Sequence, residues 1–110
     1  MGYIVLAPYR VKKENQTVFF EVVKEKRKYF TEKGFMTKRE PILLQSRKDA
    51  EILIDIFEWT SEEHIDKAHE DEGVRKLWGK MAELWVNGGF KLNELKESEM
   101  SFPNFMPIDL

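Results

Sequence analysis

The 110-residue chain contains no cysteine and only six glycines and four prolines. Without cysteine there can be no disulfide framework, no cysteine-based zinc or iron–sulfur site and no thiol nucleophile. The glycines form no phosphate-binding loop, because the one Gly-Gly pair follows a predicted helix instead of preceding it. No apolar run approaches the roughly 20 residues that a membrane-spanning helix needs. The N-terminus has no features of a secretory or transit signal, so we expect a cytoplasmic protein.

The chain also has no large excess of positive or negative charge, since its formal net charge is −2. Strong attraction to nucleic acid is therefore not expected. The distribution is uneven: residues 1–48 carry 12 Lys and Arg against 5 Asp and Glu, whereas residues 49–110 carry 6 against 15. The basic part centres on four side chains, Lys24, Lys26, Arg27 and Lys28. They form either a surface for an anionic ligand or, as we favour, the solvated face of a helix beside an acidic one, because Glu21 and Glu25 interrupt them.

Apolar side chains are well represented. Hydrophobic residues make up 42% of the chain, charged residues 35% and aromatic residues 13%, with three Trp. This mixture is too apolar for a disordered chain. The length is that of one ordinary domain, so we expect a single globular unit.

The hydrophobic pattern predicts four strands and two helices. Strands are expected at residues 3–11, 42–45, 51–59 and 90–96, and helices at about 15–33 and 61–86. Gly34 is suited to the left-handed position that ends the first helix. Thr60 and Glu63 fit a capping box at the start of the second helix. Gly73 and the acidic run Glu70-Asp71-Glu72 predict a break or a kink within that helix.

The end of the chain is expected to be less regular. Asn87-Gly88-Gly89 is predicted to end the second helix and turn the chain. Pro103 and Pro107 are expected to prevent regular structure in the tail. We therefore divide the chain into a ferredoxin-like domain at residues 1–97 and an apolar tail at residues 98–110.

The order β-α-β-β-α-β is that of the ferredoxin-like α+β fold, an antiparallel four-stranded sheet with two helices on one face. A sheet with one wet face alternates apolar and polar residues. Here residues 3–7, 42–44 and 52–57 are apolar on both faces, except for Asp55. Because two helices cover only one face, we expect a second copy of the chain to cover the other. The result would be a homodimer that packs sheet on sheet, on which the apolar tail could dock.

Asp55 is the most unusual residue, because a bare carboxylate inside an apolar strand is costly to bury. By period two it shares a face with Leu53, Phe57 and Trp59. We assign that face to the helix-free side, where Asp55 could accept or donate a proton in a cleft. The alternative is a structural ion pair at the dimer interface, with Arg10 as the expected partner.

His69 is the second candidate acid or base, since its ring could take a proton from a phenolic substrate. The alternative is a helix-surface His that is satisfied by water or by Glu72. His64 lies in the first turn of the same helix and is assigned no role. The two rings point about 140° apart around the helix. With no cysteine either, no bound metal is expected.

Four aromatic side chains are candidates for a ligand pocket: Trp59, Tyr9, Tyr3 and Phe57. Trp59 stands at a strand end beside a helix start. Tyr3 and Tyr9 share a strand face, and their hydroxyls could hold a substrate oxygen. Trp78 and Trp85 recur at helical spacing, which is more typical of core packing.

The chain resembles the antibiotic biosynthesis monooxygenase-like domains of the dimeric α+β barrel superfamily in three runs: Trp59-Thr60-Ser61-Glu62-Glu63, Ala68-His69 and Val74-Arg75-Lys76-Leu77-Trp78. Those domains often end the third strand in Trp, open a helix with Ser/Asp-Glu-Glu and place a His further along. The resemblance covers residues 3–96. It argues against the haem-degrading branch, whose Asn, Trp and His align with Tyr9, Ala68 and Trp78.

The resemblance implies a homodimeric small-molecule-binding protein similar to cofactor-independent monooxygenases that act on aromatic substrates. Asp55 and His69 would then be the acid/base groups, and the ligand would be small and apolar or aromatic. No cofactor, nucleic acid or membrane partner is expected. The alternative is a non-enzymatic ligand-binding or protein-interaction module of the same fold. Asp55 discriminates the two, because an enzyme needs this carboxylate accessible in a cavity, whereas a binding module can have it paired and closed off.

Overall fold

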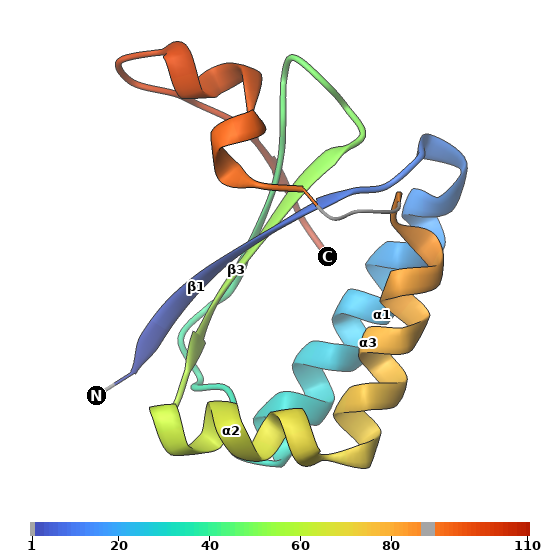
Figure 1. Ribbon diagram of the computed structural model, residues 1–110, viewed down its shortest axis with the longest axis vertical. Coiled ribbons are helices and arrows are strands. Elements are labelled where there is room, and N and C mark those ends of the chain that lie inside the picture. The colour runs from blue at the N-terminus through green and yellow to red at the C-terminus, as the bar shows by residue number, and fades with distance from the viewer. Residues whose placement is uncertain (1, 87–89) are drawn as a thin grey trace.

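The computed structural model describes residues 2–86 and 90–110. The strands are β1 (Tyr3–Arg10), β2 (Ile42–Gln45), β3 (Ile52–Trp59) and β4 (Met106–Ile108). The α-helices are α1 (Lys13–Glu32), α2 (Glu62–Glu70) and α3 (Glu72–Leu84), and two short 3-10 helices, η1 (Leu92–Glu94) and η2 (Lys96–Glu99), precede β4. Figure 1 shows α1 and α3 packed side by side, with α2 at one end of the molecule.

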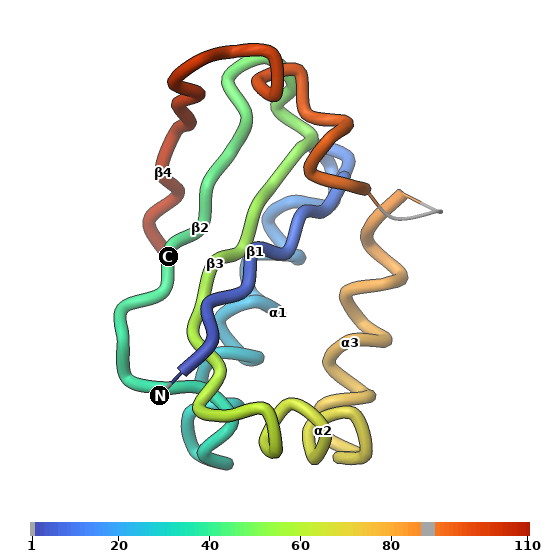
Figure 2. Tube along the Cα trace, turned by 60° about the vertical axis from the view of Figure 1, so that its left-hand side comes forward, coloured from blue at the N-terminus to red at the C-terminus, as the bar shows by residue number. Residues whose placement is uncertain are grey.

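The strands form one antiparallel sheet in the order β1-β3-β2-β4 (Figure 2). The predicted ferredoxin-like α+β fold, an antiparallel sheet with helices on one face, is confirmed. β1 pairs with β3 along its whole length, including Pro8 opposite Ile54. Proline is tolerated there because β1 is an edge strand, where a missing N–H need not interrupt a ladder on both sides.

The fourth strand lies in the tail, so the prediction of a strand at residues 90–96 is wrong. That stretch contains η1 and the start of η2, and β4 pairs instead with β2 through residues 43–45. Pro107 suggested an irregular tail, but β4 is an edge strand, the one place in a sheet where proline is accepted. Trp85 bridges Val11 beside β1. The predicted turn at Asn87-Gly88-Gly89 lies outside the described residues.

The helix ends follow side-chain chemistry. The predicted cap Thr60 is wrong by one residue: the Ser61 hydroxyl accepts from the His64 N–H (3.1 Å), while Thr60 Oγ1 donates to the Gly34 carbonyl (2.7 Å). The predicted break in the second helix is confirmed between α2 and α3, where Asp71 caps α3 by accepting from the Val74 N–H. The first helix begins after Lys12, with no side-chain cap.

The space between sheet and helices is filled by two apolar clusters. The α1 positions that enter it recur at i, i+3, i+4 and i+11, the stripe that buries one face of a helix: Phe19, Val22, Val23 and Phe30. Leu53 and Leu43 of the sheet meet the first cluster, which α3 completes. Phe57 and Trp59 meet the second cluster at the α2 end of the sheet.

The opposite face of the sheet has no helix. Cross-strand neighbours place Leu6 opposite Ile56, and Ile56 opposite Ile42, on this face. Near the β2–β3 turn the face is closed, since Ile54 is 2% exposed. Towards the start of β1 it is open: Leu6 is 46%, Ile42 49% and Ile4 55% exposed. Three large apolar side chains are thus left uncovered on a continuous surface.

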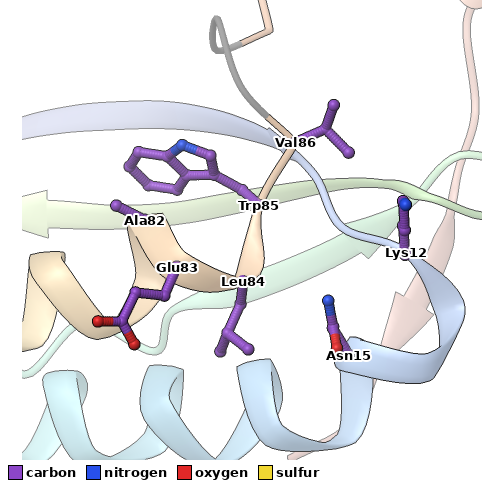
Figure 3. A pocket seen from close by; sticks show the side chains of 7 residues that line it. All are labelled: Lys12, Asn15, Ala82, Glu83, Leu84, Trp85 and Val86. Atoms are coloured by element: carbon purple, nitrogen blue, oxygen red, sulfur yellow. The ribbon is translucent and has the colours of Figure 1, made fainter.

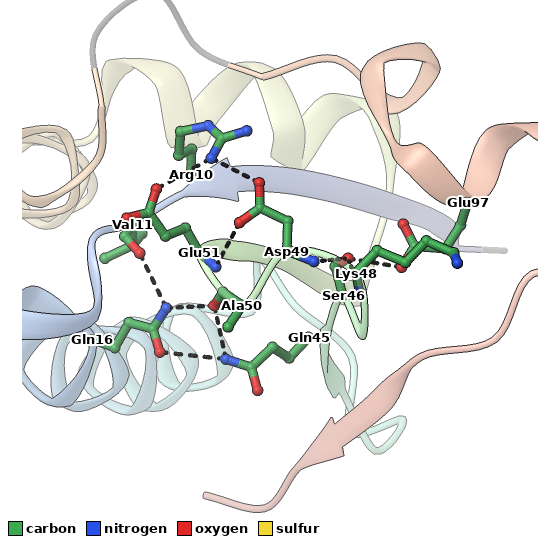
Figure 4. Close-up of polar contacts among 10 residues, drawn as sticks. All are labelled: Arg10, Val11, Gln16, Gln45, Ser46, Lys48, Asp49, Ala50, Glu51 and Glu97. Atoms are coloured by element: carbon green, nitrogen blue, oxygen red, sulfur yellow. Dashed lines mark hydrogen bonds and ion pairs between the residues drawn. The ribbon is translucent and has the colours of Figure 1, made fainter.

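The tail is fastened at the closed end of the sheet (Figure 4). The Ser46 hydroxyl donates to Glu97 Oε2 (2.7 Å) and accepts from the backbone N–H of Lys48 and Asp49. Beyond this contact the chain continues to β4 on its own β2. Docking of the tail on a dimer partner stays a prediction. Among residues 2–86 and 90–110, no helix has the length and hydropathy required to cross a membrane.

Gly34 and Gly79 form a matched pair for a stability test. Gly34 has φ +76°, and an added Cβ would meet nothing within 4 Å, so alanine there adds backbone strain alone. Gly79 lies in the exposed middle of α3, also with free space. We expect Gly34→Ala to lower the free energy of unfolding by about 1–2 kcal/mol. Gly79→Ala should raise it by about 0.5–1 kcal/mol. Urea denaturation measures both, and equal effects would contradict the assignment of Gly34 to the helix-ending position.

Candidate functional site

Asp55 lies on the helix side of the sheet, so its assignment to the helix-free face is wrong. Leu53, Phe57 and Trp59, which share its face as predicted, belong to the clusters beneath the helices. The alternation of side chains along a strand shows which residues share a face of the sheet. When the residues of both faces are apolar, this alternation does not show which face meets the helices. The expected cleft position of Asp55 is therefore replaced by a place in the core, with none of its surface exposed.

Two cations from α1 hold the Asp55 carboxylate. Lys26 Nζ donates to Oδ2 at 2.5 Å, and Arg27 Nη2 donates to Oδ1 at 3.0 Å. The expected pair with Arg10 is wrong, because Arg10 bonds to carboxylates at the far end of β1, on Asp49 and Glu51. A paired and hydrogen-bonded carboxylate avoids the several kcal/mol that a bare buried charge would cost. We call Asp55, Lys26 and Arg27 the buried trio.

Lys26 was expected on the solvated face of a helix, and that expectation is wrong for this residue. It is 1% exposed, and its ammonium lies 4.1 Å from the ring centre of Phe57 and 5.5 Å from that of Phe30. Burial lowers the pKa of Lys26, although the charge of Asp55 works in the opposite direction. One signal was present in the sequence: Lys26 stands seven residues after Phe19 and four before Phe30, on the apolar stripe of α1.

Of the four aromatic side chains that are candidates for a ligand pocket, three are buried or half-buried and one is exposed. Phe57 and Trp59 contact each other and Phe30 in the second core cluster. Tyr9 stacks on Trp85 with ring centres 5.2 Å apart. Burial raises the pKa of Tyr9, and the negative charge of Asp55 raises it further. Tyr3 lies on the same face as Tyr9 but is exposed at the other end of β1.

His69 is on the surface of α2, away from the buried trio. Its Nδ1 lies 2.8 Å from the Ile65 carbonyl oxygen, and its ring meets the edge of Trp78. Asp55 is closed off in the core while His69 is exposed. The two side chains therefore do not face a common surface, and a joint acid/base step on one substrate has no geometric basis.

The His, Asp and Glu side chains of the described residues are dispersed. No group of three or more His, Asp or Glu side chains in residues 2–86 and 90–110 could hold a metal ion. His64 bonds instead through Nδ1 with the hydroxyls of Thr60 and Ser61, at 2.8 and 2.9 Å. This ring steadies the start of α2 and is not available as a ligand on that nitrogen.

Arg27 connects the buried trio to the surface. It lines two adjoining hollows, one of about 550 Å³ against the end of α1 and one of about 330 Å³ beside β2 and β4. A further hollow of about 430 Å³ lies between the start of α1 and the end of α3, where Asn15 faces Leu84 (Figure 3). Of these three hollows, only the first two touch a member of the buried trio.

Comparison with known proteins identifies the fold but not a family. No protein-family profile matches the sequence, and no curated protein matches it either. The structure is similar to a conserved protein from Methanosarcina mazei Go1, with a TM-score of 0.65 and 19% identity over 77% of this chain and 82% of that chain. It is also similar to a "putative antibiotic biosynthesis monooxygenase" from Nitrosomonas europaea, with a TM-score of 0.63 and 13% identity over 77% and 80%. At these identities the likeness establishes the shared fold, in agreement with the resemblance seen in the sequence.

The buried trio predicts a large effect of Asp55 on stability. Asp55→Asn leaves the buried Lys26 and the partly buried Arg27 without their carboxylate, so we expect the free energy of unfolding to fall by about 3–5 kcal/mol. His69→Gln replaces an exposed ring and should change it by less than about 0.5 kcal/mol. Urea denaturation followed by circular dichroism measures both variants. A change of less than 1 kcal/mol in Asp55→Asn would mean that the trio is not holding the core together.

Proposed function

We propose that this chain is a homodimeric small-molecule-binding protein that works as a ligand-binding module. The observation that carries this choice over a monooxygenase with Asp55 as acid or base is the pairing of Asp55. Its two oxygens are bonded to Lys26 and Arg27, and it has no exposed surface. A carboxylate that must exchange protons with a substrate has to reach that substrate within hydrogen-bond distance. His69 is exposed elsewhere and does not replace it.

The dimer rests on the uncovered face of the sheet. Ile4, Leu6 and Ile42 expose about half of their surface, with Ile56 of β3 between Leu6 and Ile42, and contiguous apolar surface of this kind marks interaction sites. A stable interface needs about 800 Å² from each partner. Three side chains do not supply that area, so the interface would extend over the rest of the helix-free face, including Leu44 and Ile56. The resemblance to dimeric α+β barrel domains supports the same arrangement.

The mass in solution tests the dimer. We expect light scattering to give twice the 13.1 kDa mass of one chain. Leu6→Lys places a charge on the open face and should return the mass to 13.1 kDa. Val18→Lys is the matched control, because Val18 is an apolar side chain of α1 that is 54% exposed, and it should leave the mass unchanged.

A single-chain mass for the unsubstituted protein would refute the dimer. Equal dissociation of Leu6→Lys and Val18→Lys would instead show that the chains associate through another surface. Circular dichroism of both variants confirms that the fold is retained, so that a change in mass reports association alone.

A further inference from the structure

The charges of the buried trio do not balance. Lys26 and Arg27 bring two cationic side chains to the single carboxylate of Asp55. Arg27 also has a nitrogen, Nε, that is buried and has no hydrogen-bond partner among the described residues. Buried donors are nearly always satisfied, and an ordered water or an ion is a common partner for one that the protein leaves open. The trio therefore has the charge and a free donor to hold a second anionic group.

Arg27 is also the member of the trio that reaches open space. It lines the hollow of about 550 Å³ between the last turns of α1 and the connection from α1 to β2. We call this the Arg27 hollow. Met36 and Pro41 provide apolar surface in it. It is a shallow hollow that is widely open to solvent.

The rim of the Arg27 hollow carries further positive charge. Lys28 and Lys38 line it and form no ion pair with any described residue, whereas Arg39 is paired with Glu58. Glu32 is the carboxylate at the rim. The cations outnumber it, so the hollow favours a ligand of negative charge. Four of the twelve Lys and Arg residues in 1–48 line this hollow.

We infer that the Arg27 hollow binds a small monocarboxylate with an apolar body, held by the Arg27 guanidinium through its carboxylate and by Met36 and Pro41 through its body. Arginine suits this task because its planar fork matches a carboxylate. The inference rests on the proposed function and names the ligand class of its small-molecule site. The lining residues belong to α1 and to the connection that follows it, and Thr37 and Arg39 of that connection bond to Glu58 of β3.

A matched pair of probes tests the role of the carboxylate. The isotopically labelled full-length protein is titrated with 1-naphthoate and, separately, with neutral 1-naphthamide, and amide shifts are followed by NMR. We expect 1-naphthoate to bind at least about tenfold more tightly, the factor expected for one hydrogen bond to a charged group. The largest shifts should occur at Thr31, Met36 and Lys38, which line the hollow.

Three variants locate the site. Arg27→Gln should weaken 1-naphthoate binding about tenfold or more. Since that change also touches Asp55, Lys28→Gln/Lys38→Gln serves as the second test and should weaken binding about fivefold without disturbing the trio. Lys13→Gln, an exposed lysine at the other end of α1, is the control and should have no effect. The mass of each variant by light scattering should stay that of the unsubstituted protein.

Equal affinity for the two probes, no detectable shift with 1-naphthoate, or shifts centred on Ile4 and Leu6 would each overturn the inference. None of these results tests the proposed dimer, which is tested by the measured mass. Conversely, a monomer that binds 1-naphthoate in the Arg27 hollow would refute the proposed dimer and leave the ligand site intact.

Discussion

Asp55 meets Lys26 and Arg27 of α1 inside the protein, and this pairing decides which face of β3 the helices cover. Both faces of β3 are apolar, so hydrophobic burial alone does not choose between them. A carboxylate with no exposed surface can face the core only where cations reach it. Losing one partner of such a pair costs about 3–5 kcal/mol. This is a large part of the 5–15 kcal/mol by which a domain is stable.

The position of Asp55 also determines what remains for function. Asp55, Phe57 and Trp59 point towards the helices. The helix-free face of the sheet therefore carries Leu6, Ile42 and their neighbours. The face towards the helices closes the carboxylate off from solvent, and the helix-free face leaves apolar side chains exposed. Both consequences favour a protein that associates and binds over one that transfers protons through Asp55. Arg27, which is bonded to Asp55, also lines the Arg27 hollow at the surface.

Local signals in the sequence predicted much of the fold. Residues 42–45 form β2 as expected, Gly34 adopts positive φ after α1, and the second helix is broken before Gly73. Each of these features depends on a few neighbouring residues. The location of β4 could not be predicted from its own residues. An edge strand needs only a neighbouring strand with a free edge, and it tolerates a proline such as Pro107. The burial of Lys26 was missed because lysine is almost never fully buried unless it is paired, and its partner stands 29 residues away.

The account depends most directly on the coupling between Asp55 and Lys26, which a double-mutant cycle measures. Asp55→Asn, Lys26→Met and the double variant are compared with the unsubstituted protein by urea denaturation. If the two side chains hold each other in the core, the double variant is more stable than the sum of the single effects predicts, by about 1–3 kcal/mol. Additive effects within about 0.5 kcal/mol would show that Asp55 and Lys26 act independently and would contradict the account.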